Sequence, residues 1–185
     1  MKRFQLALLY FLVFGVLNTT GCGTVYKVAM DERSFGTQAK DEEITMALRK
    51  RFVADNSVKS LDISTYCYDG QVYLVGAYET IDQKNRAVKL AREVEGVKSV
   101  TDHFLPKKKD DPCGTKKNLE LVAKVKAKLI KDKDIWSTNI EVKAVQCHIV
   151  LLGLVGSQKE ISEAIAHAKS VEGVRSVTSF LKAVK

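Results

Sequence analysis

An internal repeat constrains the fold of this 185-residue chain more than any other feature of its sequence. A shift of 77 residues aligns VEGVKSVT, which begins at Val94, with VEGVRSVT, which begins at Val171, and only one position differs. The same shift places Asp55 on Asp132 without a gap. A repeat of this length exceeds the usual solenoid units and indicates a duplicated domain. The chain is therefore expected to build one small fold twice.

The first copy contains signals for two helices and three strands. Asp41 is the predicted N-cap of a helix, and an Asp69-Gly70 turn between β-rich runs predicts a hairpin. A capping box of Thr80 and Gln83 opens a second helix, which Gly96 ends before a closing strand. The predicted order of elements is α-β-β-α-β.

The second copy repeats this order. It has a predicted helix starting near residue 116 and ending at 131, strands around 140–145 and 149–153, and a helix opened by a Ser157–Glu160 capping box. Two amphipathic helices need one apolar sheet face to cover. We therefore predict an α+β fold of two tandem two-layer sandwiches, each with a three-stranded sheet covered by two helices.

The N-terminus has the layout of a secretory signal. Lys2 and Arg3 precede an apolar run over 4–17, which is shorter than the roughly 20 residues that a transmembrane helix needs. We predict that residues 1–21 form a signal peptide. Thr20 and Gly21, directly before Cys22, resemble the lipobox of bacterial lipoproteins, although Thr19 stands where that family usually has Leu.

The lipobox resemblance implies that Cys22 is acylated and becomes the first residue of the mature chain. Gly23, where Asp would retain a lipoprotein in the inner membrane, resembles outer-membrane sorting. Residues 22–40 are then a lipidated tether. Cleavage by the ordinary signal peptidase, which would leave Cys22 without lipid, is the alternative.

Both prolines of the chain lie in a linker over residues 106–117, which divides a first domain, 41–105, from a second domain, 118–185. The net charge of +8 is uneven: the first domain has 9 basic and 11 acidic side chains, and the second has 11 and 7. Asp110 and Asp111 of the linker are expected to be solvated. The second domain is the basic one.

Export places the cysteines in an oxidising compartment, where thiols tend to pair. If Cys22 carries lipid, Cys67, Cys113 and Cys147 remain, and at most one internal disulfide can form among them. The sequence does not choose the pair. Pairing of Cys113 with one of the two hairpin cysteines is favoured, and the remaining thiol then needs burial.

The repeated elements resemble the BON domain of osmotically inducible and outer-membrane bacterial proteins. The first copy matches the hairpin and closing motifs at Gly70, Val72, Leu74, Gly76, Val94, Gly96, Val97 and Val100. The second copy matches at Ile149, Leu151, Gly153, Val171, Gly173, Val174 and Val177. Cys147 stands where the first hairpin glycine is expected, which leaves a different turn type open there.

The segment DERSFGTQ, which begins at Asp31, is similar to the same region of dual-BON outer-membrane lipoproteins. That resemblance implies a lipoprotein on the periplasmic face of the outer membrane that supports envelope integrity. It further implies anionic phospholipid as the partner, bound through the first helix of the second domain, and no enzymatic activity or cofactor. The family has an aromatic residue near the start of this helix, where the present chain has Asn118, Leu119 and Glu120, none suited to insertion between headgroups.

The first helix of the second domain carries a candidate lipid-binding surface. At about 100° per residue, four lysines fall within about 60° of one another beside an apolar stripe of Leu121, Val125 and Leu129. The lysines are Lys117, Lys124, Lys128 and Lys131. In the alternative interpretation the stripe points into the domain core and the lysines form an ordinary solvated face. Trp136, after the helix, is either an interfacial anchor or packs the loop.

Other function classes find less support in the sequence. The three histidines and the cysteines lack zinc spacing, no glycine-rich phosphate loop occurs, and we expect neither catalysis nor a metal. Positive charge also suits nucleic acid, but an exported chain meets phospholipid, saccharide or acidic protein instead. We expect no nucleic-acid partner.

The alternative function is an envelope adaptor that docks on an assembly factor or a peptidoglycan enzyme through the first domain. Four tyrosines around the first hairpin, Tyr66, Tyr68, Tyr73 and Tyr78, are candidates for such an interaction patch. Because side chains alternate along a strand, some of them must belong to the core.

Overall fold

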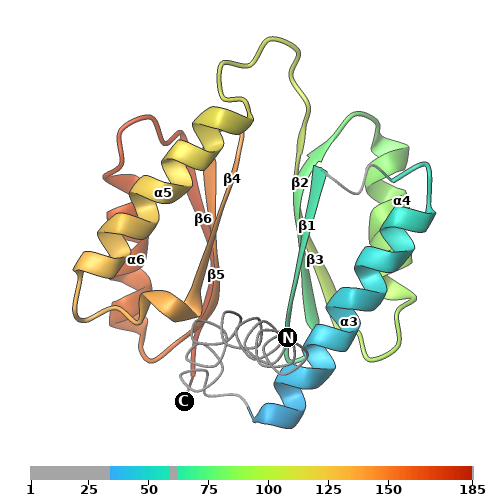
Figure 1. Cartoon of the computed structure of the whole chain (residues 1–185), viewed down its shortest axis with the longest axis horizontal. Coiled ribbons are helices and arrows are strands. Elements are labelled where there is room, and N and C mark those ends of the chain that lie inside the picture. Colours follow the sequence, from blue (N-terminus) through green and yellow to red (C-terminus); the bar gives the residue numbers. More distant parts are fainter. Residues whose placement is uncertain (1–33, 59–61, 185) are drawn as a thin grey trace, which may run out of the picture. The chain divides into compact units, whose positions relative to one another are not determined.

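The computed structural model describes residues 34–58 and 62–184, which lie in one compact unit. The first copy contains α3 (Phe35–Ala54), β1 (Ile63–Tyr68), β2 (Gln71–Tyr78), α4 (Ile81–Arg92) and β3 (Ser99–Pro106). The second contains α5 (Thr115–Lys131), a 3-10 turn η2 (Ser137–Asn139), β4 (Ile140–Val145), β5 (His148–Val155), α6 (Gln158–Lys169) and β6 (Ser176–Ala183). Figure 1 shows both copies, and the predicted order α-β-β-α-β is confirmed in each. Residues 1–21 and Cys22 lie outside the described residues.

Each copy forms one three-stranded sheet whose central strand is the second strand of the hairpin. In the first copy β1 and β2 pair antiparallel, and β3 returns to pair parallel with β2 after α4. In the second copy β4, β5 and β6 pair in the same way. The crossover helix allows the parallel pairing, which a short turn cannot provide. The predicted α+β fold of two tandem sandwiches is confirmed.

The predicted N-cap of the first helix is wrong. The helix begins at Phe35, and the hydroxyl of Ser34 accepts a hydrogen bond from the backbone N–H of Thr37 at 3.2 Å. Asp41 is instead a buried residue within α3, where its carboxyl group serves the hairpin turn described below. An Asp before an apolar run resembles a cap in sequence, but here a tertiary contact determines its role.

The hairpin turns have the same conformation in both copies. Asp69 and Gly70 have φ values of 52° and 73°, and Gln146 and Cys147 have values of 49° and 62°. Positive φ at both central residues is the geometry of a two-residue hairpin turn that fits the twist of the strands. The second turn therefore keeps its type although Cys147 replaces the expected glycine.

The hairpin glycine motif has a steric cause. A Cβ atom on Gly76 would lie 2.0 Å from the backbone oxygen of Asp62, and one on Gly153 would lie 1.9 Å from that of Asn139. The chain that enters each sheet therefore approaches the second strand too closely for any side chain. The resemblance to the BON hairpin at these two positions thus has a physical reason in this chain.

Each copy has its own helix-covered core, and a third apolar cluster joins the other faces of the two sheets. Its buried members are Tyr73, Val75, Val145, Val150 and Leu152. The Tyr73 and Phe180 rings lie 5.3 Å apart, and the Gln146 side-chain amide donates to the Pro106 carbonyl at 2.7 Å. The central strands are therefore buried on both faces, which explains the continuous apolar run at Val150.

This third cluster removes most of the predicted tyrosine patch. Tyr73 is buried in it, and Tyr66 and Tyr68 are partly buried against it. The tyrosines of the first hairpin therefore contact the second copy of the repeat. The prediction that they form an open interaction surface is wrong for Tyr73, because its strand position faces the other sheet.

Candidate functional site

The helix α5 is fixed at its N-terminus by a covalent bond and by hydrogen bonds. Cys113 and Cys147 form a disulfide, which agrees with the favoured pairing of Cys113 with a hairpin cysteine. The Asn118 side chain accepts from the backbone N–H of Cys147 at 2.9 Å and donates to the Cys113 carbonyl at 3.3 Å. Cys67 is buried outside the disulfide, and its thiol donates to a carboxylate oxygen of Asp41 at 3.2 Å. The start of α5 is thus tied to the hairpin turn.

One side of α5 belongs to the domain core. Leu121, Val125 and Leu129 are fully or almost fully buried. The interpretation that this stripe points into the domain is confirmed, and these side chains are not available to lipid. In the part of the chain that the structure describes, no helix is both long and apolar enough to cross a bilayer.

Three of the four predicted lysines already have partners. The carboxylate of Glu120 accepts from the ammonium groups of Lys117 at 3.1 Å and Lys124 at 2.5 Å. The ammonium group of Lys128 donates to the hydroxyl of Ser170 at 2.7 Å. Lys131 is exposed and makes no ion pair with any described residue. Since exposed ion pairs contribute little, Lys117 and Lys124 retain most of their freedom to meet another anion.

The exposed face of α5 also carries apolar residues. Leu119 is 65% exposed and Ile130 is 69% exposed, and helix geometry places them within about 20° of each other. Lys126 lies on the same strip as Leu119, and Lys116 lies about 60° from it. Leu119 is therefore exposed at the start of the helix, where the family's aromatic residue is absent from this chain. The sequence signal was present, because both residues fall outside the core stripe of the helix.

The charge of α5 is strongly positive. The helix contains six lysines and one acidic residue, Glu120. The equivalent helix α3 of the first copy contains four basic and three acidic residues. The two copies therefore share a fold but differ in the charge of their first helices, and α5 is the one suited to a dense layer of anions.

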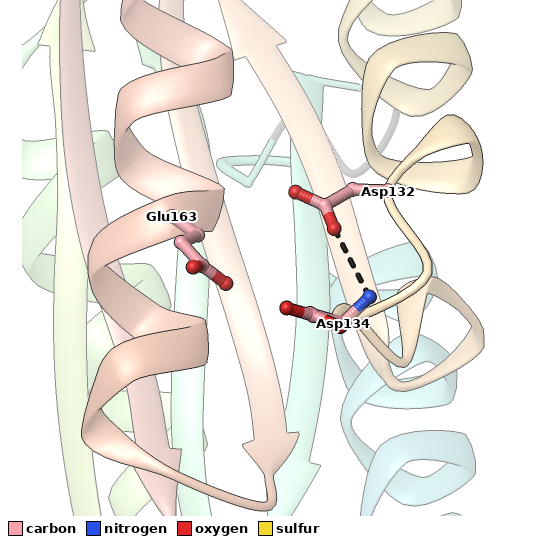
Figure 2. Close-up of side chains that lie close together, drawn as sticks. All are labelled: Asp132, Asp134 and Glu163. Atoms are coloured by element: carbon pink, nitrogen blue, oxygen red, sulfur yellow. Dashed lines mark hydrogen bonds between the residues drawn. The ribbon is translucent and has the colours of Figure 1, made fainter.

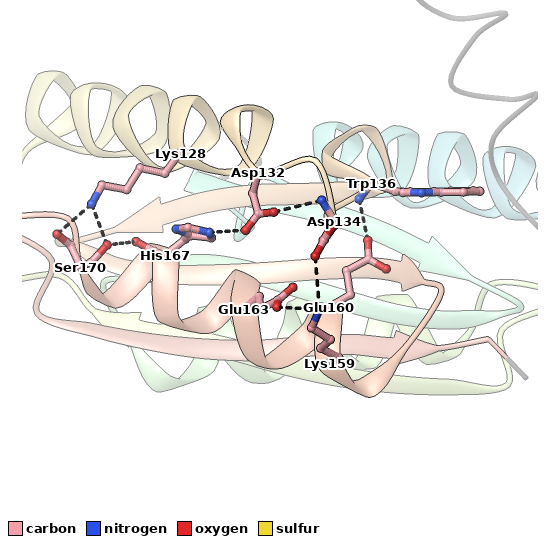
Figure 3. Close-up of polar contacts among 9 residues, drawn as sticks. All are labelled: Lys128, Asp132, Asp134, Trp136, Lys159, Glu160, Glu163, His167 and Ser170. Carbon is pink, nitrogen blue, oxygen red and sulfur yellow. Dashed lines mark hydrogen bonds and ion pairs between the residues drawn. The ribbon is translucent and has the colours of Figure 1, made fainter.

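Trp136 follows α5 in the loop that leads to β4, and it is 46% exposed. Its backbone N–H donates to the carboxylate of Glu160 at 2.7 Å, and the other oxygen of Glu160 accepts from Gly156 N–H at 2.9 Å. Figure 3 shows the indole ring directed away from the polar contacts around it. The loop is fixed through its backbone, and the side chain is partly exposed for an interfacial contact.

Three carboxylates lie close together below this loop. Asp132, Asp134 and Glu163 offer oxygens within 4.8 Å of one another, as Figure 2 shows. The ammonium group of Lys159 lies 3.2 Å from an Asp134 oxygen and 3.4 Å from a Glu163 oxygen. The protein therefore supplies its own cation here, and the cluster serves as an ion-pair network that joins the loop to α6.

A histidine completes this network. The Nε2 atom of His167 lies 2.7 Å from an Asp132 oxygen (Figure 3). This bond, followed by the backbone N–H of Asp134, holds the pKa of Asp132 below its ordinary value. The contacts hold the end of α5 and the loop before Trp136 in a fixed geometry, which is a structural role.

The linker is also more ordered than its charges indicate. Asp111 was expected to be solvated, but its side chain is nearly buried and accepts from the Arg175 guanidinium at 2.7 Å. The same contact lowers the pKa of Asp111, with a further contribution from Cys113 N–H. The charged neighbours of Asp111 in the sequence, Lys108 and Asp110, did not indicate that Arg175 would be its partner.

The chain belongs to the BON domain family. The family match covers residues 40–105 and 118–185, which are the two copies of the repeat. The class is thus defined by two BON domains that flank a short linker, with an exposed basic helix at the start of the second domain.

Several curated proteins are similar over most of the chain. The osmotically-inducible protein Y of Escherichia coli is 33% identical over 166 residues, which cover 89% of this chain and 83% of that protein. The outer membrane lipoprotein DolP of Haemophilus influenzae is 30% identical over 163 residues, which cover 88% and 84%. A 21 kDa hemolysin of Actinobacillus pleuropneumoniae is 25% identical over 157 residues, which cover 84% and 80%.

Proposed function

We propose that this protein is a lipoprotein of the outer membrane that binds anionic phospholipid through α5 and helps to maintain envelope integrity. The observation that carries the proposal is the outer face of α5, where Leu119 and Ile130 are exposed among lysines and only one acidic residue is present. The similarity to an outer membrane lipoprotein supports the location. Trp136, in the loop after α5, is 46% exposed and is the proposed interfacial anchor.

The expected strength of this contact is modest. A lysine near an anionic membrane surface contributes about 1 kcal/mol, and shallow burial of aliphatic side chains adds to this. Since Lys128 is bonded to Ser170 and Lys126 lies 3.9 Å from a Glu141 oxygen, about four of the six lysines remain, which gives a free energy of roughly 4 kcal/mol and a dissociation constant on the order of 1 mM. Contacts of this strength become effective when a tether holds the domain close to the bilayer.

The proposed tether is the lipid on Cys22. Stable anchoring needs two membrane signals, such as two acyl chains, and weak docking by α5 alone would not hold the protein on a membrane. Mass spectrometry of the mature N-terminus tests this part of the proposal. A diacylated or triacylated Cys22 supports the tether, and an unmodified N-terminus overturns it.

A vesicle-binding experiment tests the role of α5. The soluble chain without residues 1–22 is expected to co-sediment with phosphatidylglycerol vesicles and not with phosphatidylcholine vesicles. Lys116→Glu with Lys131→Glu should weaken the anionic binding by at least tenfold, because two exposed cations without ion pairs among the described residues become anions. Lys89→Glu with Arg92→Glu on the exposed side of α4 is the matched control and should bind like the parent. Equal binding to both vesicle types would contradict the proposal.

The alternative adaptor function keeps only part of the tyrosine surface on which it was based. Tyr73 is buried against the second copy, and Tyr66 and Tyr68 pack beside it. An adaptor that docks on an assembly factor or a peptidoglycan enzyme through the first domain would need a different surface. Cross-linking at Tyr78, which is partly exposed, provides a direct check of that alternative.

A further inference from the structure

The helix α3 is apolar on two opposite faces. Ile44, Leu48 and Phe52 are buried in the core of the first domain. Met46 and Val53 lie about 20° apart on the outer side of the helix, and they are 54% and 72% exposed. The outer strip has no function in the core, since the inner face already contacts β1. Packing in the first domain therefore does not account for its apolar character.

Two cations flank this outer strip. Helix geometry places Arg49 about 40° to one side of Val53 and Lys50 about 60° to the other. Both are exposed, and neither makes an ion pair within the described ranges, whereas Arg51 pairs with Glu93 at 3.6 Å. We define the α3 patch as Met46, Arg49, Lys50 and Val53. The patch itself carries only positive charge, and the exposed carboxylates of Glu42 and Glu43 lie beside it, one turn before Met46.

The repeat places the same kind of surface on α5. At the 77-residue shift Val53 corresponds to Ile130, and Arg49 corresponds to Lys126. An exposed aliphatic residue with a basic neighbour one turn before it thus occurs at the same outer position in both copies. The core packing of either domain does not require these residues.

The position of α3 in the chain brings it close to the proposed anchor. Phe35, the first residue of α3, follows Cys22 by 13 residues, which span at most about 47 Å in any conformation. The helix is therefore the first described element after the lipid attachment site. If Cys22 is acylated, the start of α3 cannot lie farther than this from the bilayer.

We propose that the α3 patch is a second contact with the anionic membrane surface, made in place of the α5 contact and not together with it, because the two helices cover the outer sides of two sheets whose other faces pack together. The inference rests on the proposed function, because it requires a bilayer close to Cys22. Two aliphatic side chains insert shallowly, and the stems of Arg49 and Lys50 lie along them while the charged groups bind lipid phosphates. Four side chains are too few for a stable protein interface, which needs about 20 residues on each side. A lipid surface has no such requirement.

The single tryptophan of the chain makes the two contacts separately measurable. Both proteins are measured as full chains with excess phosphatidylglycerol vesicles. In the parent protein Trp136 reports on the second domain. In the double variant Trp136→Phe with Val53→Trp, the new tryptophan reports on the α3 patch. In both proteins we expect vesicles to shift the tryptophan emission to the blue and brominated lipid to quench it. Trp136→Phe with Ile81→Trp is the matched control, because Ile81 is exposed on α4, and it should show neither effect.

The outcomes separate this inference from the proposed function. If Trp136 responds to vesicles and a tryptophan at position 53 does not, the inference fails and the proposed function stands. If only position 53 responds, α5 docking fails and the α3 contact is retained. Addition of Arg49→Glu and Lys50→Glu should abolish the response at position 53 while circular dichroism stays unchanged. A shift that depends on protein concentration without vesicles indicates contact between copies of the chain and overturns the inference.

Discussion

The two BON domains hold the same hairpin turn by different means. In the first domain the carboxyl group of Asp41 accepts from the backbone N–H groups of Asp69 and Gly70, each at 2.8 Å. In the second domain Asn118 occupies the position of Asp41, and it accepts only from Cys147 N–H. The disulfide from Cys147 to Cys113 accompanies this weaker contact.

The difference shows that the turn conformation is the conserved requirement of the duplicated fold, and that glycine is one of several ways to meet it. A residue other than glycine in the left-handed region costs about 1 kcal/mol. Cys147 adopts that region with a φ of 62°, where covalent attachment and the Asn118 contact hold it. The second domain thereby ties the start of α5 to its sheet, and α5 is the helix that we propose to dock on lipid.

The largest expected effect comes from removal of the disulfide. Cys113→Ser with Cys147→Ser should lower the free energy of unfolding by about 4 kcal/mol, because the bond closes a loop with a sequence separation of 34. Urea unfolding under oxidising conditions measures this loss. Cys67→Ala, at the buried cysteine outside the disulfide, is the control and should cost less than about 1.5 kcal/mol. Equal losses in the two proteins would contradict the assigned role of the bond.

A glycine at position 147 sharpens this test. Cys113→Ser with Cys147→Gly should recover about 1 kcal/mol relative to the double serine variant, because glycine adopts the positive φ without strain. The same urea measurement applies. No recovery would mean that strain at Cys147 is not part of the difference between the two turns.

The Asp41 contact is expected to have the next largest effect. Asp41→Ala leaves two turn N–H groups without their acceptor and should cost about 2 to 3 kcal/mol of unfolding free energy. Asp41→Asn copies the residue of the second domain and should cost about 1 kcal/mol, since an amide oxygen still accepts. Chemical denaturation of the two variants distinguishes these values. A larger loss for Asn than for Ala would refute this account of the turn.

The smallest effect concerns the ends of the two first helices, where Asp55 and Asp132 are equivalent. Bonds from Ser57 and Arg86 lower the pKa of Asp55 from 3.8 to about 2. A lowered pKa stabilises the fold above the ordinary value of 3.8, and this contribution is lost as the pH falls towards 2. Asp55→Asn should therefore lower the thermal midpoint slightly at pH 6, and the difference should shrink as the pH falls through 2. A difference in thermal midpoint that does not change with pH would contradict this role of the Asp55 carboxylate.

Local patterns in the sequence predicted most of the fold. The capping hydroxyls of Thr80 and Ser157 accept from Gln83 and Glu160 N–H groups as expected, at 3.1 and 3.2 Å. These capping signals involve residues only three positions apart, so they can be read from the sequence alone. The repeat added independent support, because each element was predicted twice.

Contacts between distant segments were harder to predict. The burial of Asp41 depends on a turn 28 residues later, and the burial of Tyr73 depends on the second sheet. On α5 the sequence predicted the lysine stripe but not the exposed pair Leu119 and Ile130, because periodicity does not show which apolar residues outside the core stripe stay uncovered. Periodicity determines which residues share a face, and only the tertiary structure determines what that face meets.

The most direct test of lipid docking by α5 is photo-cross-linking in living cells with a photoreactive residue at position 130. The account predicts phospholipid adducts whose yield falls when anionic lipid is depleted, and no such adducts from the same residue at position 89 on α4. A single dominant protein adduct at position 130, unchanged by lipid composition, would contradict it.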